Sequence, residues 1–98
     1  MSLNRWAKRR DSNEGEIVDA LRAIGCVVKR LDVVDLAVAY RGRNIFLELK
    51  DGARPPSARK LTPAQILFKA EWQDRGQWDV VTSAYEAIAV VQRHTLGR

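Results

Sequence analysis

Two apolar runs joined by a short polar turn constrain the fold of this 98-residue chain more than any other feature. Residues 33–40 have the sequence VVDLAVAY, residues 44–50 have the sequence NIFLELK, and Arg41, Gly42 and Arg43 separate them. Apolar, β-branched and aromatic residues on either side of a glycine-containing turn predict a β-hairpin. Because both runs are almost continuously apolar, we expect two strands that are covered on both faces.

Helices and further strands are predicted around this hairpin. A first helix is expected to begin at Asp11 or Ser12, either of which can cap it, and to end at Gly25. Its apolar stripe consists of Ile17, Val18, Leu21 and Ile24. The other elements are a strand at 26–31, a loop at 51–60, a helix to Arg75 that Thr62 caps and Pro63 begins, a strand at 78–83 and a helix at 84–94 that Ser83 caps. The predicted order is α-β-β-β-α-β-α, an α/β fold.

Composition limits the class of protein. The length fits one domain at residues 12–98, after a flexible basic arm at residues 1–11. The single cysteine, Cys26, excludes an intramolecular disulfide and a cysteine-based zinc site. No apolar run reaches the roughly 20 residues of a membrane span and no secretory signal is evident, so we expect a cytoplasmic protein without a membrane partner. The net charge of +5 favours a polyanionic partner such as nucleic acid.

Three charged residues interrupt the hairpin strands. Glu48 and Lys50 share one face of their strand, because side chains alternate across a strand. A turn that pairs residue 41 with residue 43 would put Asp35 opposite Leu49, whereas a shift of one residue or a bulge would bring Asp35 onto the face of Glu48 and Lys50. Converging carboxylates can hold Mg²⁺ through oxygen, and a neighbouring lysine can stabilise a phosphate transition state. A plain salt bridge of Lys50 with Asp35 or Glu48 is the alternative interpretation.

These residues carry a resemblance to a known family. Asp35, twelve intervening residues and then Glu48-Leu49-Lys50 resemble the PD-(D/E)XK nuclease superfamily, although Val34 stands where that motif usually has proline. More specifically, the chain resembles the compact stand-alone VRR-NUC (virus-type replication-repair nuclease) proteins of phages from about residue 9 to residue 90. The segments that carry this resemblance, in order, are RRDSNEGEIVDALRAIGCVV, FLELKDG, PPSARKLTPAQ and VVTSAYEAI.

The resemblance implies a restriction-endonuclease-like mixed sheet flanked by helices, and it implies roles for named residues. Asp35, Glu48 and the Leu49 carbonyl would hold Mg²⁺ or Mn²⁺, and Lys50 would be the catalytic lysine. Two helical residues would support this site. They are Glu14, an additional acidic residue for which Glu16 is the alternative, and Gln65, which would lie beside the catalytic residues.

The same resemblance implies a metal-dependent endonuclease that cuts branched DNA, such as Holliday junctions, as a homodimer. Trp72, Trp78 or the last helix could supply an apolar contact, although ordinary core packing explains each of them as well. Basic and hydroxyl side chains near the site are expected to contact DNA phosphates: Arg9, Arg10, Arg54, Ser57, Arg59, Lys60 and Thr62. Two alternatives are a catalytically silent DNA-binding module of the same fold and a protein-interaction domain whose charge serves solubility.

Overall fold

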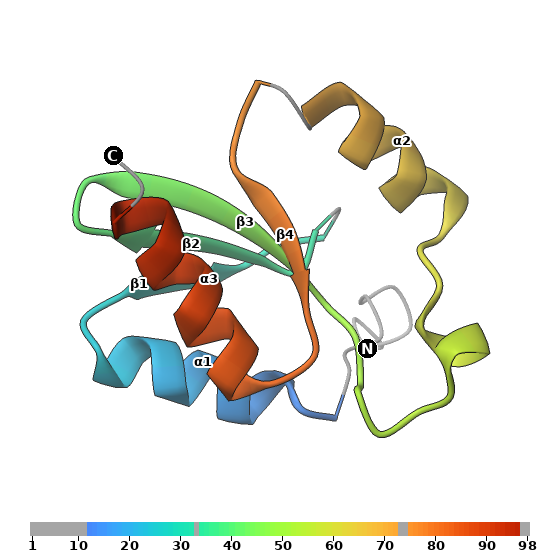
Figure 1. Ribbon diagram of the computed structural model, residues 1–98, viewed down its shortest axis with the longest axis horizontal. Helices are drawn as coiled ribbons and strands as arrows, with labels where there is room; N and C mark the ends of the chain where they lie inside the picture. Colours follow the sequence, from blue (N-terminus) through green and yellow to red (C-terminus); the bar gives the residue numbers. More distant parts are fainter. Residues whose placement is uncertain (1–11, 33, 73–74, 97–98) are drawn as a thin grey trace, which may run out of the picture.

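The elements follow one another in the predicted order. The computed structural model describes residues 12–32, 34–72 and 75–96, so the predicted arm at 1–11 lies outside the described residues. Three α-helices, a short 3₁₀ helix and a four-stranded mixed sheet occur in these ranges (Figure 1). Their bounds are α1 (Glu14–Ala23), β1 (Val27–Arg30), β2 (Leu36–Tyr40), β3 (Arg43–Leu49), η2 (Pro56–Arg59), α2 (Pro63–Trp72), β4 (Trp78–Val81) and α3 (Ala84–Leu96).

The hairpin of β2 and β3 turns on two residues rather than three. Tyr40 pairs directly with Arg43, and Arg41 and Gly42 between them have φ of 51° and 79°. Positive φ at both turn residues is typical of the type I′ turn, whose twist suits a tight hairpin. The pairing is therefore shifted by one residue from a register centred on Gly42. β1 continues the sheet antiparallel to β2, and β4 runs parallel to β3 at the other edge.

One face of the sheet forms the hydrophobic core. α1 and α3 lie against this face and contact each other (Figure 1). Alternate residues of the hairpin point into it, so that Leu36 lies opposite Leu47 and Val38 lies opposite Ile45. The helices contribute Ile17, Val18, Leu21, Ala87, Val90 and Val91. Burial of this apolar surface is the main source of stability for a domain of this size.

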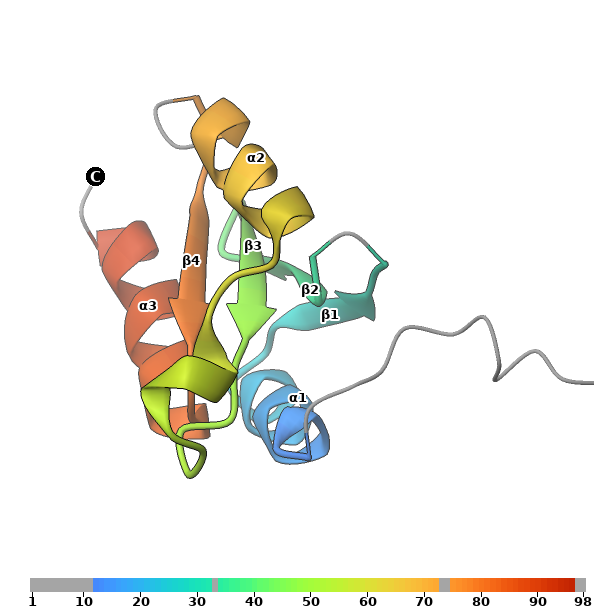
Figure 2. The same ribbon diagram turned by 90° about the vertical axis from the view of Figure 1, so that its right-hand side faces the viewer.

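The opposite face of the sheet is only partly covered. α2 lies over β3 and β4 (Figure 2). There Phe46 of β3 contacts Phe68 and Trp72, with ring centroids 5.9 and 5.0 Å away. Trp78 of β4 joins the same aromatic cluster. Ala39 of β2 is exposed on this side, so the prediction that both hairpin strands are covered on both faces is wrong for β2. Helix α2 lies over β3 and β4 and leaves this part of β2 uncovered.

Several element boundaries differ from the predicted ones. Helix α1 begins at Glu14, later than expected, with Asn13 at the N-cap position. The Asn13 side chain makes no capping bond and instead binds other parts of the chain. Gly25, with φ of 100°, follows the last turn as predicted, and the Cys26 N–H donates back to the Leu21 carbonyl as in a Schellman motif. The first hairpin strand is shorter than residues 33–40, and Arg75, the expected end of α2, lies in a turn beyond the described helix Pro63–Trp72.

Cys26 lies in the core, as expected for a small apolar residue. It is buried, and desolvation by that burial raises the pKa of its thiol. A thiol of this kind is a poor nucleophile at neutral pH. Among the described helices, none combines the length and the apolar character that crossing a membrane requires.

Candidate functional site

The three charged residues of the hairpin meet at the carboxyl end of β3. Leu36 pairs with Leu47 at the end of the ladder, so alternation puts the side chains of the next residues, Asp35 and Glu48, on the same face of the sheet. Lys50, two residues beyond Glu48, shares this face, which is the one that α2 covers. Asp35 is only 4% exposed and Glu48 only 1%, although carboxylates are almost never buried without compensation. The compensation therefore has to be found among their neighbours.

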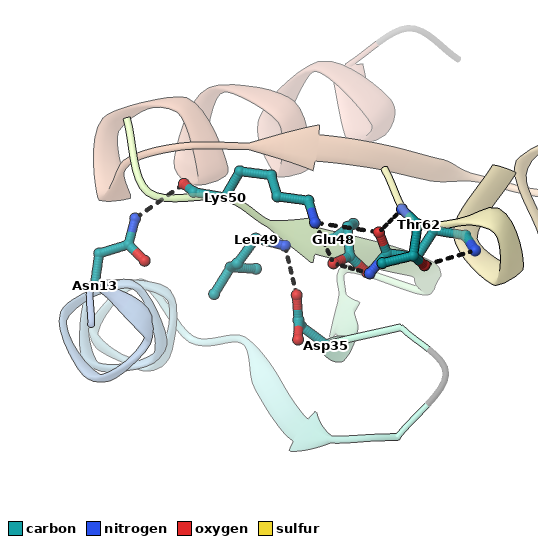
Figure 3. A network of polar contacts seen from close by, with 7 residues as sticks. Asn13, Asp35, Glu48, Leu49, Lys50 and Thr62 are labelled. Atoms are coloured by element: carbon teal, nitrogen blue, oxygen red, sulfur yellow. Dashed lines mark hydrogen bonds and ion pairs between the residues drawn. The ribbon is translucent and has the colours of Figure 1, made fainter. Parts of the chain in front are cut away.

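Asp35 is held by the backbone of the neighbouring strand. Its carboxylate oxygen Oδ2 accepts a hydrogen bond of 2.7 Å from the Leu49 N–H (Figure 3). The Asp35 carbonyl in turn accepts from the Leu31 N–H at 2.9 Å, which closes the chain between β1 and β2. In an extended strand the N–H and C=O of one residue point to the same side, so the Leu49 carbonyl is directed toward the side on which Asp35 lies.

Glu48 and Lys50 are joined by a glutamine from the other layer. The Gln65 amide nitrogen Nε2 donates to Glu48 Oε2 at 2.6 Å, and Lys50 Nζ lies 3.6 Å from the same oxygen. Lys50 Nζ also donates to Gln65 Oε1 at 3.1 Å (Figure 3). Gln65 is the one described residue of α2 that is buried, at 7% exposure. The ion pair anticipated as an alternative thus exists, within a larger network.

The first turn of Gln65's own helix completes this network. Thr62 N–H donates to Gln65 Oε1 at 2.9 Å, and Gln65 N–H donates to Thr62 Oγ1 at 3.2 Å. These reciprocal bonds form a capping box, which the spacing Thr62-Pro63-Ala64-Gln65 encodes as T-x-x-Q. Thr62 was predicted as the cap of this helix and as a phosphate contact, and Gln65 as a site residue, but the bond between their side chain and backbone groups was missed. The T-x-x-Q spacing is the signal that could have revealed it.

Glu14 approaches the same end of the sheet from α1. It is 5% exposed, and its Oε2 accepts a hydrogen bond of 2.6 Å from Arg30 Nε at the end of β1. Glu16, the alternative to Glu14, is exposed. Arg30 was not predicted, because nothing in the spacing of residues 14 and 30 indicates that α1 and β1 bring them together.

Asn13 fastens the start of α1 to the end of β3. Its Nδ2 donates to the Lys50 carbonyl at 3.2 Å and to the Thr82 carbonyl at 2.9 Å. It therefore fixes the backbone from which the Lys50 side chain projects. No sequence pattern indicated this role, since an asparagine before a helix is ordinarily explained as a cap.

The predicted DNA-contacting residues of the loop lie beside this site along the chain. Arg54, Ser57 and Lys60 are exposed, and Arg59 is half-buried. Arg54 Nε lies 3.9 Å from Asp51 Oδ2, a weak surface pair. Thr62 is exposed, although its N–H and hydroxyl are used by Gln65. Arg9 and Arg10 lie outside the described residues.

The oxygen atoms at this site suit a hard cation. Asp35 and Glu48 offer carboxylate oxygens on the α2 face of the sheet, and the Leu49 carbonyl is directed toward the strand beside which Asp35 lies. In the described part of the chain, no three His, Cys, Asp or Glu side chains gather closely enough to hold a metal ion. Mg²⁺ is usually held by one or two carboxylates with water and substrate phosphate, so two carboxylates fit that ion. Glu14 as a further ligand stays a prediction.

Comparisons with protein-family models, with curated proteins and with solved structures found no match to this chain. The resemblance to PD-(D/E)XK nucleases therefore rests on the residues quoted above. The geometry of those residues is the basis for a functional proposal.

Proposed function

We propose that this protein is a Mg²⁺- or Mn²⁺-dependent DNA endonuclease with a restriction-endonuclease-like fold, related to VRR-NUC proteins. The observation that carries the proposal is the meeting of Asp35, Glu48 and Lys50 on one face at the end of β3. Both carboxylates are buried there, and Lys50 Nζ is 3.6 Å from Glu48 Oε2. Buried charges weaken a fold unless they are compensated, and proteins concentrate such departures at functional sites.

Each residue has a chemical role in phosphodiester hydrolysis. Asp35, Glu48 and the Leu49 carbonyl would hold the cation, which neutralises charge on the scissile phosphate and promotes ionisation of the attacking water. Lys50 directs its ammonium group toward the oxygen on which negative charge develops in the transition state. Gln65 restrains the two charged side chains by bonding to both. The Leu49 N–H holds the Asp35 carboxylate in place.

The substrate that we propose is branched DNA such as a Holliday junction. The loop between β3 and α2 carries Arg54, Arg59 and Lys60 directly after the catalytic strand, where cations suit the DNA backbone. A homodimer would present two sites related by a two-fold axis, as symmetric cuts in a junction require.

The test is cleavage of a labelled four-way junction and a matched linear duplex, in Mg²⁺ and then in Mn²⁺. Wild type should make metal-dependent paired nicks in the junction, and Lys50→Ala should not. Lys29→Ala is the matched control, because Lys29 is an exposed lysine of β1 outside the network. Cutting by Lys50→Ala at the wild-type rate would contradict the proposed chemistry.

The catalytically silent DNA-binding module is the second candidate. The observation that favours it is the pairing of Glu48 with both Lys50 and Gln65, which compensates that carboxylate without a cation. It predicts tight junction binding by folded wild-type protein with no cutting in either metal. Such a result would assign the carboxylates a structural role.

A further inference from the structure

The side-chain amide of Gln65 is oriented by three neighbours that leave it a single arrangement. The Thr62 N–H and the Lys50 ammonium group can only donate, and each contacts Oε1, at 2.9 and 3.1 Å. The ionised Glu48 carboxylate can only accept, and it receives Nε2 at 2.6 Å. Rotation of the amide by half a turn would place like groups together at all three contacts. The amide orientation is therefore part of the site's geometry.

Of these three neighbours, Thr62 is the one whose position does not depend on the site itself. Proline at the next position disfavours helical backbone at Thr62 and pre-sets the first helical residue, Pro63. The Thr62 hydroxyl accepts the Gln65 N–H at 3.2 Å, and the Thr62 carbonyl accepts the Ile66 N–H at 2.9 Å. The start of α2 thus fixes the direction of the Thr62 N–H independently of the charges on Glu48 and Lys50.

We propose that Thr62 is a positioning residue: its capping box with Gln65 orients the amide that holds Glu48 and Lys50 in their working arrangement. The inference rests on the proposed nuclease function and deepens it. Formation of the α2 N-terminus and assembly of the site are therefore coupled. The Thr62 hydroxyl accepts the Gln65 N–H and keeps its own O–H as a donor, so the phosphate contact of Thr62 stays a separate prediction.

A second helix of the chain offers a matched control. Ser83 precedes α3, and its Oγ accepts the Glu86 N–H at 3.1 Å, the same bond that Thr62 Oγ1 accepts. The Glu86 side chain reaches back as well, to the N–H and hydroxyl of Thr82, both at 2.7 Å. Ser83 has no contact with Glu48, Lys50 or Gln65 in the described structure. Loss of either cap should lower the thermal midpoint similarly, but only one should affect the site.

The kinetic experiment compares Thr62→Ala, Thr62→Ser and Ser83→Ala in the junction-cleavage assay. Thr62→Ala keeps the N–H that binds Gln65 Oε1 but removes the hydroxyl that ties Thr62 to the Gln65 backbone. We expect kcat to fall about ten- to hundredfold while KM changes less than about twofold, since misplaced groups cost rate rather than binding. Thr62→Ser keeps the hydroxyl and should restore kcat, and Ser83→Ala should retain it. Equal kcat in Thr62→Ala and Ser83→Ala would overturn the proposal. A rise in KM at constant kcat would overturn it too, in favour of a phosphate contact.

A second readout needs neither metal nor DNA. The side-chain NH₂ resonances of Gln65, recognised by their absence in Gln65→Leu, should exchange slowly in wild-type protein. In Thr62→Ala they should move toward the positions and exchange rates of a solvated glutamine, and in Ser83→Ala they should not. Unchanged resonances in Thr62→Ala would contradict the positioning role. If wild type cuts no DNA yet these shifts occur, the nuclease proposal fails while the structural coupling stands.

Discussion

The two faces of the sheet are built from the same strands yet carry different kinds of residues. On the α1 and α3 side, every inward residue of β2 and β3 that is fully buried is apolar, as at Leu36, Val38 and Leu47. On the α2 side, the same strands present Phe46, then a carboxylate at Glu48. Alternation along a strand allows one segment to supply a core and a site at once.

This difference between the faces explains why the hairpin sequence reads as a core segment interrupted by charges. The charges do not interrupt the core, because they leave the apolar face intact and occupy the opposite one. The second face has an aromatic cluster under α2, a polar network at the end of β3 and an uncovered region over β2. We expect stability to depend mainly on the first face and activity on the second.

Loss of a large side chain from the first face should have the largest effect on stability. Leu47 is 0% exposed, so Leu47→Ala should lower the free energy of unfolding by about 2–5 kcal/mol through lost burial and a residual cavity. Urea denaturation followed by circular dichroism measures this change. Leu67→Ala on α2 is the control, because Leu67 is 60% exposed and should cost about 0.5 kcal/mol or less. Similar losses in both variants would remove the distinction between the faces.

Loss of the charge at Glu48 should instead lower activity strongly and stability little. Glu48→Gln keeps the shape and an acceptor for Gln65, so the free energy of unfolding should change by about 1 kcal/mol or less. Junction cleavage should fall about 10²–10³-fold, the usual effect of removing one electrostatic group from an active site. Glu71→Gln, at an exposed position of helix α2 and outside the site, should cut as wild type does. A stability loss as large as that of Leu47→Ala would show that Glu48 is structural.

Much of the fold was predictable because it follows from local rules. Apolar periodicity and turn residues predicted the element order, Gly25 marked the end of α1, and the Ser83 and Thr62 caps marked two helix starts. The register was not predictable, because it depends on Arg41 adopting positive φ, which a non-glycine residue seldom does. A one-residue slip would move Asp35 off the face that Glu48 and Lys50 occupy, and the sequence is compatible with both registers.

The candidate site was predictable in its strand residues and less so in its contacts. Glu48 and Lys50 share a face by alternation alone, whereas Asp35 joins them through the register that the turn selects. The pair of Glu14 and Arg30 depends on how α1 packs against β1, which no short-range pattern encodes. Asn13 likewise acts through tertiary contacts with two distant carbonyls. Such contacts follow from packing, which is decided by the whole chain.

Adjacent residues of β2 test the two faces with the same substitution. Val38 is 1% exposed and points into the core, whereas Ala39 is exposed on the α2 side. Val38→Thr should lower the free energy of unfolding by about 1–3 kcal/mol, because it buries a hydroxyl among apolar residues that offer it no hydrogen bond. Ala39→Thr should change it by about 0.5 kcal/mol or less, since threonine suits an exposed strand position. Equal losses would mean that something covers Ala39 in solution.

The smallest expected effect lies outside both faces, at the start of α3. Hydrogen bonds from the Thr82 hydroxyl and then from the Thr82 N–H lower the pKa of Glu86 below its ordinary value. A carboxylate whose pKa is lower in the folded state contributes stability above its unfolded pKa and loses it as the pH falls through its folded pKa. Glu86 is exposed, so solvent weakens the contribution, and we expect only a slight effect.

The measurement is the free energy of unfolding of wild type and Glu86→Gln at neutral pH and on acidification below about pH 4.5. The wild type should be the more stable at neutral pH, and the difference should shrink toward acid, where Glu86 becomes protonated. A difference that does not depend on pH would assign the contribution of Glu86 to shape rather than charge. Junction cleavage at neutral pH should be nearly the same for both proteins, because the Glu86 side chain hydrogen-bonds to Thr82 and to none of Asp35, Glu48 and Lys50 in the described structure.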